Sequence, residues 1–251
     1  MKLKNFFTIL TFTFFLTSTC NSEDSCPSDD SYHIKYLLDK ASDSRTSKKN
    51  ESKIALEKLL EIKSTGDIEL LIDEFSTKNI SKKIILYQIF NHLGKTASPF
   101  LKKTLRKRDE KTDLVILILG NIGDKSSRKK IRKYLDDPDR IIRKSATEAL
   151  GNLKDKHSVK KLMKLTEDPW DPIRLTAIRS LEMIDDKRAV SCLIQKLNDP
   201  IFNVRFAASE ALIKFKNDAE PKLEKFLEIH LEKHIKLLAL KTLNEMKNGK
   251  K

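Results

Sequence analysis

The feature that most constrains this chain is an internal period of 31 residues. Four columns of residues keep that spacing in one register: Asp137, Asp168 and Asp199, each followed by proline; Arg143, Arg174 and Arg205, continued by Lys236; Ala146, Ala177, Ala208 and Ala239; and Leu150, Leu181, Leu212 and Leu243. Self-similarity at a fixed period of roughly 20 to 50 residues is the signature of stacked supersecondary units. The period therefore predicts a repeat architecture.

The apolar residues inside one unit predict a pair of helices. The first stripe has three-to-four spacing and consists of Ile142, Ala146, Ala149, Leu150 and Leu153. A second stripe consists of Val159, Leu162 and Leu165, after a break at residues 151–155. The unit is thus predicted to be a helical hairpin with about 12 residues per helix. An Asp followed by Pro fits the N-cap and first turn of the first helix.

Weaker copies of the unit extend toward the N-terminus. Residues 115–124 match residues 146–155, and shorter hairpins are expected over 84–105 and 54–75. About six hairpins and a C-terminal half-unit then account for residues 51–246. With six glycines and seven prolines the chain has too few turn residues for an all-β protein. Hairpins of this size cannot bury their apolar faces alone, so the prediction is an all-α fold, an α-solenoid.

The repeat also resembles a known family. The run Asp-Pro-x-x-x-x-Arg-x-x-Ala-x-x-x-Leu, followed by an Asp and a second amphipathic helix, resembles the HEAT repeats of the PBS-lyase-like class over about four-fifths of the chain. The resemblance implies a right-handed α-solenoid over residues 51–251, with the second helix of each pair on the inner curve. It also implies that the Asp and Arg columns form a ladder between neighbouring units. A row of arginines that binds anions is the alternative.

The N-terminus has the outline of an export signal. Lys2 and Lys4 precede an apolar run over residues 6–16, which is too short to span a bilayer permanently. The segment Leu16-Thr17-Ser18-Thr19-Cys20 resembles a relaxed bacterial lipobox, which implies that Cys20 is lipidated. We therefore expect an exported lipoprotein of the bacterial envelope, attached to the membrane through its lipid anchor only. Simple secretion and an uncleaved cytoplasmic N-terminus are the alternatives.

This N-terminal interpretation sets the expected domain organisation. Residues 1–19 form the signal peptide, and residues 20–50 hold the lipid-attachment cysteine, a polar tether and a possible first helix from Tyr32 to Ala41. Residues 51–251 form the solenoid. Three cysteines are too few for a disulfide scaffold, and we expect Cys26 and Cys192 to be unpaired.

The sequence shows no catalytic constellation. His230 and His234 have metal-ligand spacing on a predicted helix, but Leu231 stands where a zincin has Glu. The His-Glu pairs of di-iron hydroxylases that share the repeat are absent from the sequence. Gly120-x-x-Gly123 lacks the rest of a phosphate loop, and Cys192 has no accompanying base. We therefore expect no enzymatic activity, no metal and no cofactor.

The basic surface is the strongest functional signal. The formal charge of +14 bears on the partners of a chain and not on its fold. The 31-residue register places several lysines in columns on the second helices of the middle hairpins. The candidate residues for an anionic partner are Lys102, Lys103, Lys129, Lys130, Arg132, Lys133, Lys160, Lys161 and Lys164. Trp170, the sole tryptophan, is either an interface anchor or a side chain packed over the adjacent turn.

These features predict a non-enzymatic binding or scaffold protein that recognises a macromolecule along the solenoid surface. The expected partner is a protein, with an anionic envelope polymer as a further possibility. A basic nucleic-acid-binding protein similar to the alkyl-base glycosylases is the alternative if the chain is cytoplasmic, and export disfavours it. An enzyme similar to the bilin lyases is a third reading.

Overall fold

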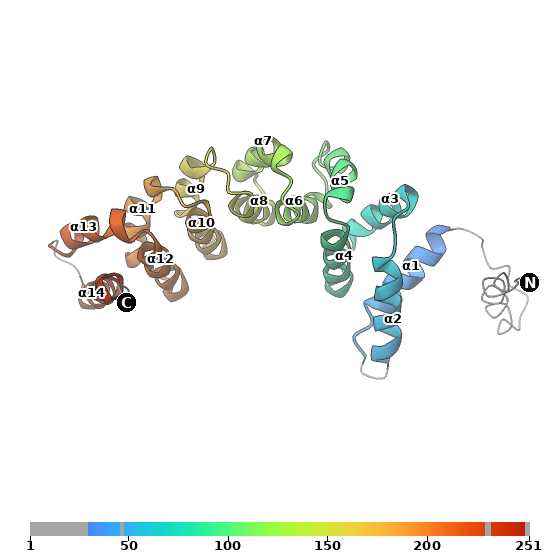
Figure 1. Ribbon diagram of the computed structural model, residues 1–251, viewed down its shortest axis with the longest axis horizontal. Coiled ribbons are helices and arrows are strands. Elements are labelled where there is room, and N and C mark those ends of the chain that lie inside the picture. The colour runs from blue at the N-terminus through green and yellow to red at the C-terminus, as the bar shows by residue number, and fades with distance from the viewer. Residues whose placement is uncertain (1–29, 46–47, 229–231, 249–251) are drawn as a thin grey trace, which may run out of the picture.

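The protein is an all-helical solenoid. The computed structural model describes residues 30–45, 48–228 and 232–248, and every regular element in those ranges is a helix. Figure 1 shows the helices stacked side by side along an arc, with α1 near one end and α14 at the other. This confirms the all-α solenoid predicted from the 31-residue period, while the right-handed sense of the superhelix stays a prediction.

Along the arc, the helices succeed one another in the order of the sequence. The N-terminal elements are α1 (Asp30–Ala41), α2 (Lys49–Leu60), α3 (Thr65–Asp73), η2 (Glu74–Ser76), α4 (Ile80–Leu93), η3 (Gly94–Ala97) and α5 (Ser98–Thr104). The central elements are α6 (Thr112–Asn121), η4 (Lys125–Ser127), α7 (Arg128–Ile131), η5 (Arg132–Asp136), α8 (Arg140–Asn152) and α9 (Val159–Leu165). The C-terminal elements are α10 (Asp171–Ile184), η6 (Lys187–Ala189), α11 (Val190–Gln195), η7 (Lys196–Asn198), α12 (Phe202–Lys214), α13 (Lys216–Leu227) and α14 (Lys233–Asn248).

These elements form the expected hairpins. The even-numbered helices from α2 to α12 are the first helices of the pairs, each followed by an odd-numbered second helix, and α14 is the C-terminal half-unit. The short helix expected at Tyr32 is α1, which packs against α2, α3 and α4. Its Leu38 is fully buried and belongs to the same apolar core as the hairpins.

Most of the second helices are shorter than the predicted 12 residues, although α13 has that length. The α-helical part of the second element has seven residues in α9, six in α11 and four in α7. In the third and fifth hairpins, 3-10 turns precede and follow the α-helical part. The turns form because Asp124 and Asp186 accept backbone N–H groups two residues ahead, at Ser126 and Arg188, where the second element begins.

The prediction that the repeated Asp caps the first helix is wrong. The N-cap residues of α8, α10 and α12 are Asp139, Trp170 and Ile201, which lie two positions after Asp137, Asp168 and Asp199. Each repeated Asp instead accepts the backbone N–H of that N-cap residue, at 2.9 to 3.0 Å. The carboxylate therefore fixes the turn that enters the helix, and its remaining hydrogen-bonding capacity is left for a partner outside the turn.

That partner is an arginine of the preceding hairpin, so the expected Asp–Arg ladder is present. Arg143 Nε lies 3.1 Å from Asp168 Oδ2, and Arg174 Nε lies 2.9 Å from Asp199 Oδ2. Arg174 also donates to the carbonyl oxygen of Asp168 in its own turn, at 3.0 Å. Each arginine thus joins the turn of its own hairpin to that of the next hairpin.

At its two ends the ladder differs from the pattern of the 31-residue Asp and Arg columns. Asp137 is held by Arg108, from the loop before α6, through two hydrogen bonds of 2.8 Å. The 31-residue register did not identify this arginine, because Thr112 occupies the column position. Arg205 donates to the carbonyl oxygens of Asp199 and Pro200. The next position for a carboxylate is His230, which lies outside the described residues.

The helices that line the inner curve are not the expected ones. The resemblance implied that the second helices lie there, and the structure places the first helices there instead. Figure 1 shows the first helices, from α4 to α12, on the inner side of the arc and the second helices on its outer side. The first helices approach closely because small residues stand where they meet. A Cβ at Gly120 would lie 2.5 Å from the Cα of Ala149, and one at Gly151 would lie 2.5 Å from Ser180 Oγ. The second helices have no such close contact at a glycine, and they spread apart on the outside.

Hydrogen bonds reinforce this close packing of the first helices. Ser180 Oγ donates to the carbonyl oxygen of Thr147 across α8 and α10, at 2.9 Å. Ser209 and Thr242 share a buried hydrogen bond of 2.7 Å across α12 and α14. Because these groups are buried, leaving one of them unpaired would cost about 1 to 3 kcal/mol.

The substitution Gly120→Ala tests the close approach. The added methyl group would overlap the backbone of α8, so we expect a lower urea midpoint and a loss on the order of 1 to 3 kcal/mol, despite the better helix propensity of alanine. Gly66→Ala in α3 is the matched control. The nearest atom there is Ser64 Oγ at 3.6 Å, so its midpoint should stay equal or rise. A midpoint for Gly120→Ala above that of the wild type would contradict this account.

The substitution Asp199→Asn tests the ladder. It leaves the buried Arg174 without its counter-charge, and we expect a loss on the order of 3 kcal/mol in chemical denaturation. Asp137→Asn is the control, because its partner Arg108 has a 48% exposed side chain and can be solvated, so the loss should be smaller. Equal losses for the two variants would show that burial of the arginine does not matter.

The pH dependence of Asp199→Asn gives a second readout. Burial alone would raise the pKa of Asp199, but hydrogen bonds from Arg174 and from the Ile201 N–H outweigh it, and the folded pKa lies below the usual value. The ionised carboxylate therefore stabilises the fold above its unfolded pKa of about 4, and that stabilisation is lost as the pH falls through the folded pKa. The variant should lose less stability than the wild type over this acidic range.

Candidate functional site

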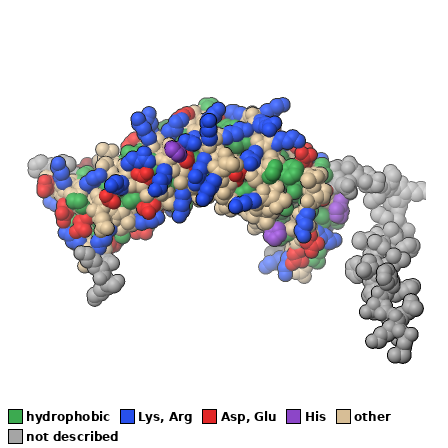
Figure 2. Space-filling view, turned by 45° about the horizontal axis from the view of Figure 1, so that its top comes forward, with side chains coloured by type: hydrophobic (Ala, Val, Ile, Leu, Met, Phe, Trp, Pro, Cys, Tyr) green, Lys and Arg blue, Asp and Glu red, His purple; other side chains and the backbone are tan. Residues whose placement is uncertain are grey.

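The structure brings six of the candidate basic residues together in one groove. The groove lies on the outer side of the arc, between the third and fourth hairpins, and has a volume of 480 Å³. Its lining residues are Lys129, Arg132, Lys133, His157, Lys160, Lys161 and Lys164. Figure 2, in which the outer side is turned toward the viewer, shows Lys and Arg side chains gathered over the middle of the molecule. We call this feature the basic groove.

The groove is formed by two neighbouring second helices. Lys129 lies on α7 and Lys133 on η5, four residues apart, while Lys160 and Lys164 have the same relation on α9. Residues four apart share one face of a helix, so each element presents a pair of lysines to the other. His157, from the loop between α8 and α9, was missed by the sequence reasoning because it stands outside the lysine columns.

Few carboxylates neutralise the groove. Lys161 pairs with Asp136, and Arg132 Nε lies 3.3 Å from Oδ2 of Asp155, which is buried. The other four lysines, Lys129, Lys133, Lys160 and Lys164, are exposed and have no ion pair with any residue that the structure describes. The groove therefore keeps an excess of positive charge that faces solvent.

The positive surface continues beyond the groove toward the N-terminal hairpins. Burial lowers the pKa of Lys130, and the neighbouring charges of Arg106 and Lys133 lower it further. Lys130 therefore lies close enough to Arg106 and to Lys133 to be repelled by both. Since Arg106 precedes α6 and Lys133 lines the groove, the basic surface crosses from the second hairpin to the third.

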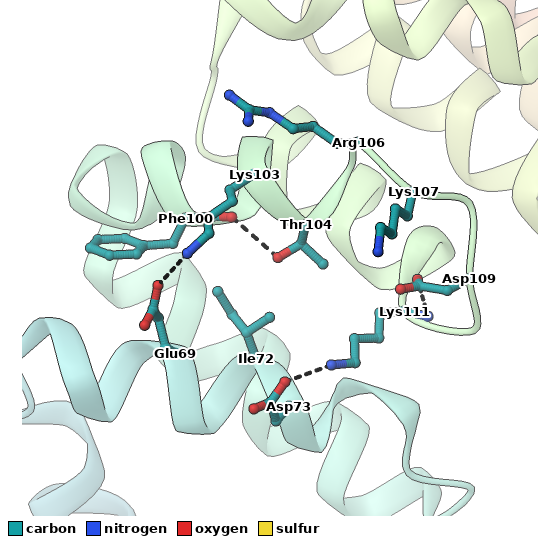
Figure 3. Close-up of a pocket in the computed structure, with 10 residues that line it drawn as sticks. All are labelled: Glu69, Ile72, Asp73, Phe100, Lys103, Thr104, Arg106, Lys107, Asp109 and Lys111. Atoms are coloured by element: carbon teal, nitrogen blue, oxygen red, sulfur yellow. Dashed lines mark hydrogen bonds and ion pairs between the residues drawn. The ribbon is translucent and has the colours of Figure 1, made fainter.

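Lys102 and Lys103 do not join the groove. Lys102 Nζ donates to Ser126 Oγ at 3.1 Å and lies 3.7 Å from Asp124. Lys103 lines a separate pocket of 500 Å³ between α3, α5 and the loop before α6, shown in Figure 3. In that pocket Lys103 pairs with Glu69 at 3.0 Å, and Lys111 pairs with Asp73 at 2.7 Å. Lys102 and Lys103 are thus each held by a carboxylate of a neighbouring hairpin.

Trp170 packs over its turn and is also partly exposed. The guanidinium carbon of Arg140, on the preceding first helix, lies 4.8 Å from the centre of the indole ring. The backbone N–H of Trp170 donates to the Asp168 carboxylate, which belongs to the ladder. A cation over the face of an indole is attracted by its quadrupole, so this contact supports the packing role of Trp170.

The remaining chemical candidates show no site. Burial raises the pKa of the Cys192 thiol to about 11, which disfavours the reactive thiolate. His234 lies 3.3 Å from Glu232, and His230 and Cys20 lie outside the described residues. Within the described ranges, no group of three or more His, Cys, Asp and Glu side chains could hold a metal ion. None of the helices described there is long and apolar enough to cross a membrane.

The family profile of HEAT repeats matches the chain twice, over residues 97–182 and 159–244. The two matches together span more than half of the 251 residues. This chain belongs to the HEAT repeat family. The matched part of this HEAT repeat chain contains the basic groove and the Asp–Arg ladder, so both features are built on the repeat scaffold.

Solved structures are similar to this HEAT repeat chain in fold. The YibA protein of Escherichia coli has 14% identity and a TM-score of 0.52, with 89% of this chain and 99% of that chain covered. An engineered protein has 18% identity and a TM-score of 0.51, with 85% and 68% covered. The complex of CpcE and CpcF, a phycocyanin lyase from Nostoc sp. PCC7120, has 16% identity and a TM-score of 0.45, with 90% and 99% covered.

The likenesses to YibA and to the engineered protein, at identities of 14% and 18%, show a shared fold and nothing more. A search of curated proteins finds no match to the sequence. Function must therefore be argued from the surface of this chain itself.

Proposed function

We propose that this HEAT repeat chain is a binding scaffold that holds an acidic macromolecule in the basic groove, with no covalent step. The observation that carries the proposal is the lining of the groove, which consists of six lysine and arginine residues and one histidine. Partners with complementary potentials are steered to such a surface and held in register on it. The rigid stack of hairpins supplies the fixed spacing of the charges.

The geometry of the charges favours an extended partner over a small ion. The unpaired lysines come in two pairs on adjacent second helices, and packed helices lie about 10 Å apart. That distance is close to the Debye length of about 8 Å at physiological salt, so the pairs repel one another weakly when nothing is bound. A chain with several negative charges can neutralise both pairs at once, whereas a single small anion cannot.

An acidic protein segment fits the groove better than a single-stranded nucleic acid. Single-stranded nucleic acids are held by aromatic side chains on which bases stack, and the groove lining contains no Phe, Tyr or Trp. An anionic envelope polymer has the same charge chemistry as an acidic peptide and is the second candidate.

We further propose that the scaffold acts in the bacterial envelope, anchored through Cys20. The support is the sequence alone, because the basic start, the short apolar run and the lipobox-like segment all precede the described residues. Multiple acyl chains, at about 0.8 kcal/mol per buried methylene group, would anchor the chain durably and leave the solenoid in the aqueous phase.

The proposed groove is tested by a fourfold variant in which Lys129, Lys133, Lys160 and Lys164 are changed to Gln. Labelled poly-glutamate is the probe, and fluorescence anisotropy measures its dissociation constant. Four exposed charge contacts contribute about 0.2 to 1 kcal/mol each, or about 0.8 to 4 kcal/mol together, so we expect the affinity to fall by about fourfold to several hundredfold. Binding to the wild type should also weaken as salt is raised.

The matched control changes four exposed lysines outside the groove, Lys58, Lys63, Lys78 and Lys236, to Gln. It removes the same formal charge, so it separates a located site from a general effect of net charge. Equal losses in the two variants would reject the groove as the site. Stronger binding of polyphosphate than of poly-glutamate, with the same dependence on the groove lysines, would favour an anionic polymer over an acidic protein.

The proposed anchor is tested by Cys20→Ala in cells of the source organism. Radiolabelled palmitate should be incorporated into the wild-type chain and not into the variant, because the thiol of Cys20 is the acceptor in the proposed lipidation. Cys26→Ala is the control, since it removes a neighbouring thiol that follows the lipobox-like segment. Equal labelling of wild type and Cys20→Ala, or an unlabelled cytoplasmic wild-type chain, would contradict anchoring.

A further inference from the structure

Two arginines of the third hairpin, Arg128 on α7 and Arg132 on η5, stand at positions that are apolar in the next two hairpins. The 31-residue period places Arg128 in one column with Val159 and Val190, and Arg132 in another with Met163 and Ile194. Those four apolar side chains belong to the core or pack against it. A cation at such a position is costly unless it has a partner.

Both arginines reach the turn between α8 and α9 in the fourth hairpin. Arg128 donates to the carbonyl oxygen of Leu153, and Arg132 Nε lies 3.3 Å from Asp155 Oδ2. The side chain of Asp155 is only 1% exposed, and its Oδ2 accepts no hydrogen bond from any residue that the structure describes. A buried carboxylate needs a cation close to it, so Arg132 and Asp155 hold each other in place.

Asp155 is available to Arg132 because its carboxylate does not hold its own turn. Asp124 and Asp186, which share its column, each accept the backbone N–H of the residue two positions ahead. Between Asp155 and His157, which are both described, no such bond forms. Ser158 closes this turn instead, since its N–H and its hydroxyl donate to the carbonyl oxygen of Asp155 at 3.0 and 2.7 Å.

The contact with Asp155 leaves the far end of the Arg132 guanidinium for the basic groove. Arg132 Nε also donates to the carbonyl oxygen of Arg128 at 3.5 Å, so the Nε edge faces the protein. Its Nη1 and Nη2 form no hydrogen bond with a described residue, and Arg132 is the only arginine among the seven residues that line the groove. A planar guanidinium matches the two oxygens of a carboxylate, whereas a lysine ammonium acts as a point charge.

We propose that Arg132 determines the specificity of the basic groove by binding one carboxylate of an acidic protein segment through two parallel hydrogen bonds from Nη1 and Nη2. This inference rests on the proposed binding of an acidic partner in the groove. Asp155 is a positioning residue, because it keeps the guanidinium in one orientation and so reduces the freedom that is lost on binding. The four unpaired lysines attract the other charges of the segment without fixing its register.

Salt separates the contribution of Arg132 from that of the lysines. The lysines are exposed, and attraction between exposed charges is screened as salt is raised. The side chain of Arg132 is 30% exposed, and a partly buried pair is screened much less. In a plot of log Kd against log salt concentration, the slope therefore reports mainly on the lysines, and the affinity that remains at high salt reports mainly on Arg132.

The test is Arg132→Lys in the full chain, which keeps the net charge and removes the fork. Labelled poly-glutamate is the probe, and anisotropy titrations are made at several salt concentrations. We expect the affinity to fall about tenfold at every concentration with the slope unchanged, because a bidentate pair is replaced by a point charge. The fourfold lysine variant of the groove should show the other pattern, a flatter slope.

Arg179→Lys is the matched control, because Arg179 is an exposed arginine on α10 outside the groove. It makes the same chemical change and should leave the dissociation constant and the salt slope equal to those of the wild type. Urea denaturation of each variant checks that the comparison is made between folded chains.

The positioning role of Asp155 is tested by a double-mutant cycle. Asp155→Asn should weaken binding when residue 132 is arginine and have little further effect in the Arg132→Lys chain, since Asp155 acts through the guanidinium. The loss of a buried counter-charge should also lower the urea midpoint. A purely structural role would instead weaken binding equally in both backgrounds, and that result would overturn the positioning of Arg132 by Asp155.

The specificity role of Arg132 fails if Arg132→Lys binds poly-glutamate as the wild type does at every salt concentration. It also fails if that variant only flattens the slope, because Arg132 would then act as one more charge. Either result, combined with weak binding by the fourfold lysine variant, would reject this inference and keep the groove as the binding site. Wild-type binding by the fourfold variant would reject the groove itself.

Discussion

The close approach of the first helices is the constraint on which the other features of this solenoid depend. Gly120 and Gly151 leave no room for a Cβ, because Ala149 and Ser180 of the next helix occupy that space. The first helices are therefore drawn together on one side of the stack, and the shorter second helices spread on the other side. This difference bends the stack into an arc and decides which surface is inner and which is outer. The basic groove lies outside because its lysines are on second helices.

The Asp–Arg ladder complements this packing at the turns between hairpins. Asp199 bonds the backbone of its own turn at Ile201 and the guanidinium of Arg174 from the preceding hairpin. One carboxylate thus fixes both the entry of a helix and the position of its neighbour. Since both partners are buried, either one alone would be an uncompensated charge, and the pair enforces the register of adjacent units. The surface charges of neighbouring hairpins are therefore held at the same regular spacing as the hairpins themselves.

The sequence predicted what depends on the period and missed what depends on the relative packing of units. Lys129 and Lys160 could be placed side by side because they share a column and the register is regular there. Lys103 could not be placed, because its partner Glu69 lies on an earlier hairpin of shorter period. Arg108 was missed because it reaches Asp137 from a loop outside the column. The resemblance placed the second helices on the inner curve, and this was wrong. Curvature depends on the distances between neighbouring helices, and the residue pattern within a single helix does not give those distances.

The lysines of the basic groove repeat one sign from hairpin to hairpin, and that repetition supports the proposed binding of an acidic partner. Lys129 and Lys160 share one column of the 31-residue period, and neither forms an ion pair with a residue that the structure describes. The electrostatic fields of the two lysines therefore add, and an extended partner of opposite charge gains from both. Because the two lysines face solvent, that gain decreases as salt is raised. A small anion that meets only one helix gains from one pair of lysines alone, so the repeat itself favours a partner long enough to span two hairpins.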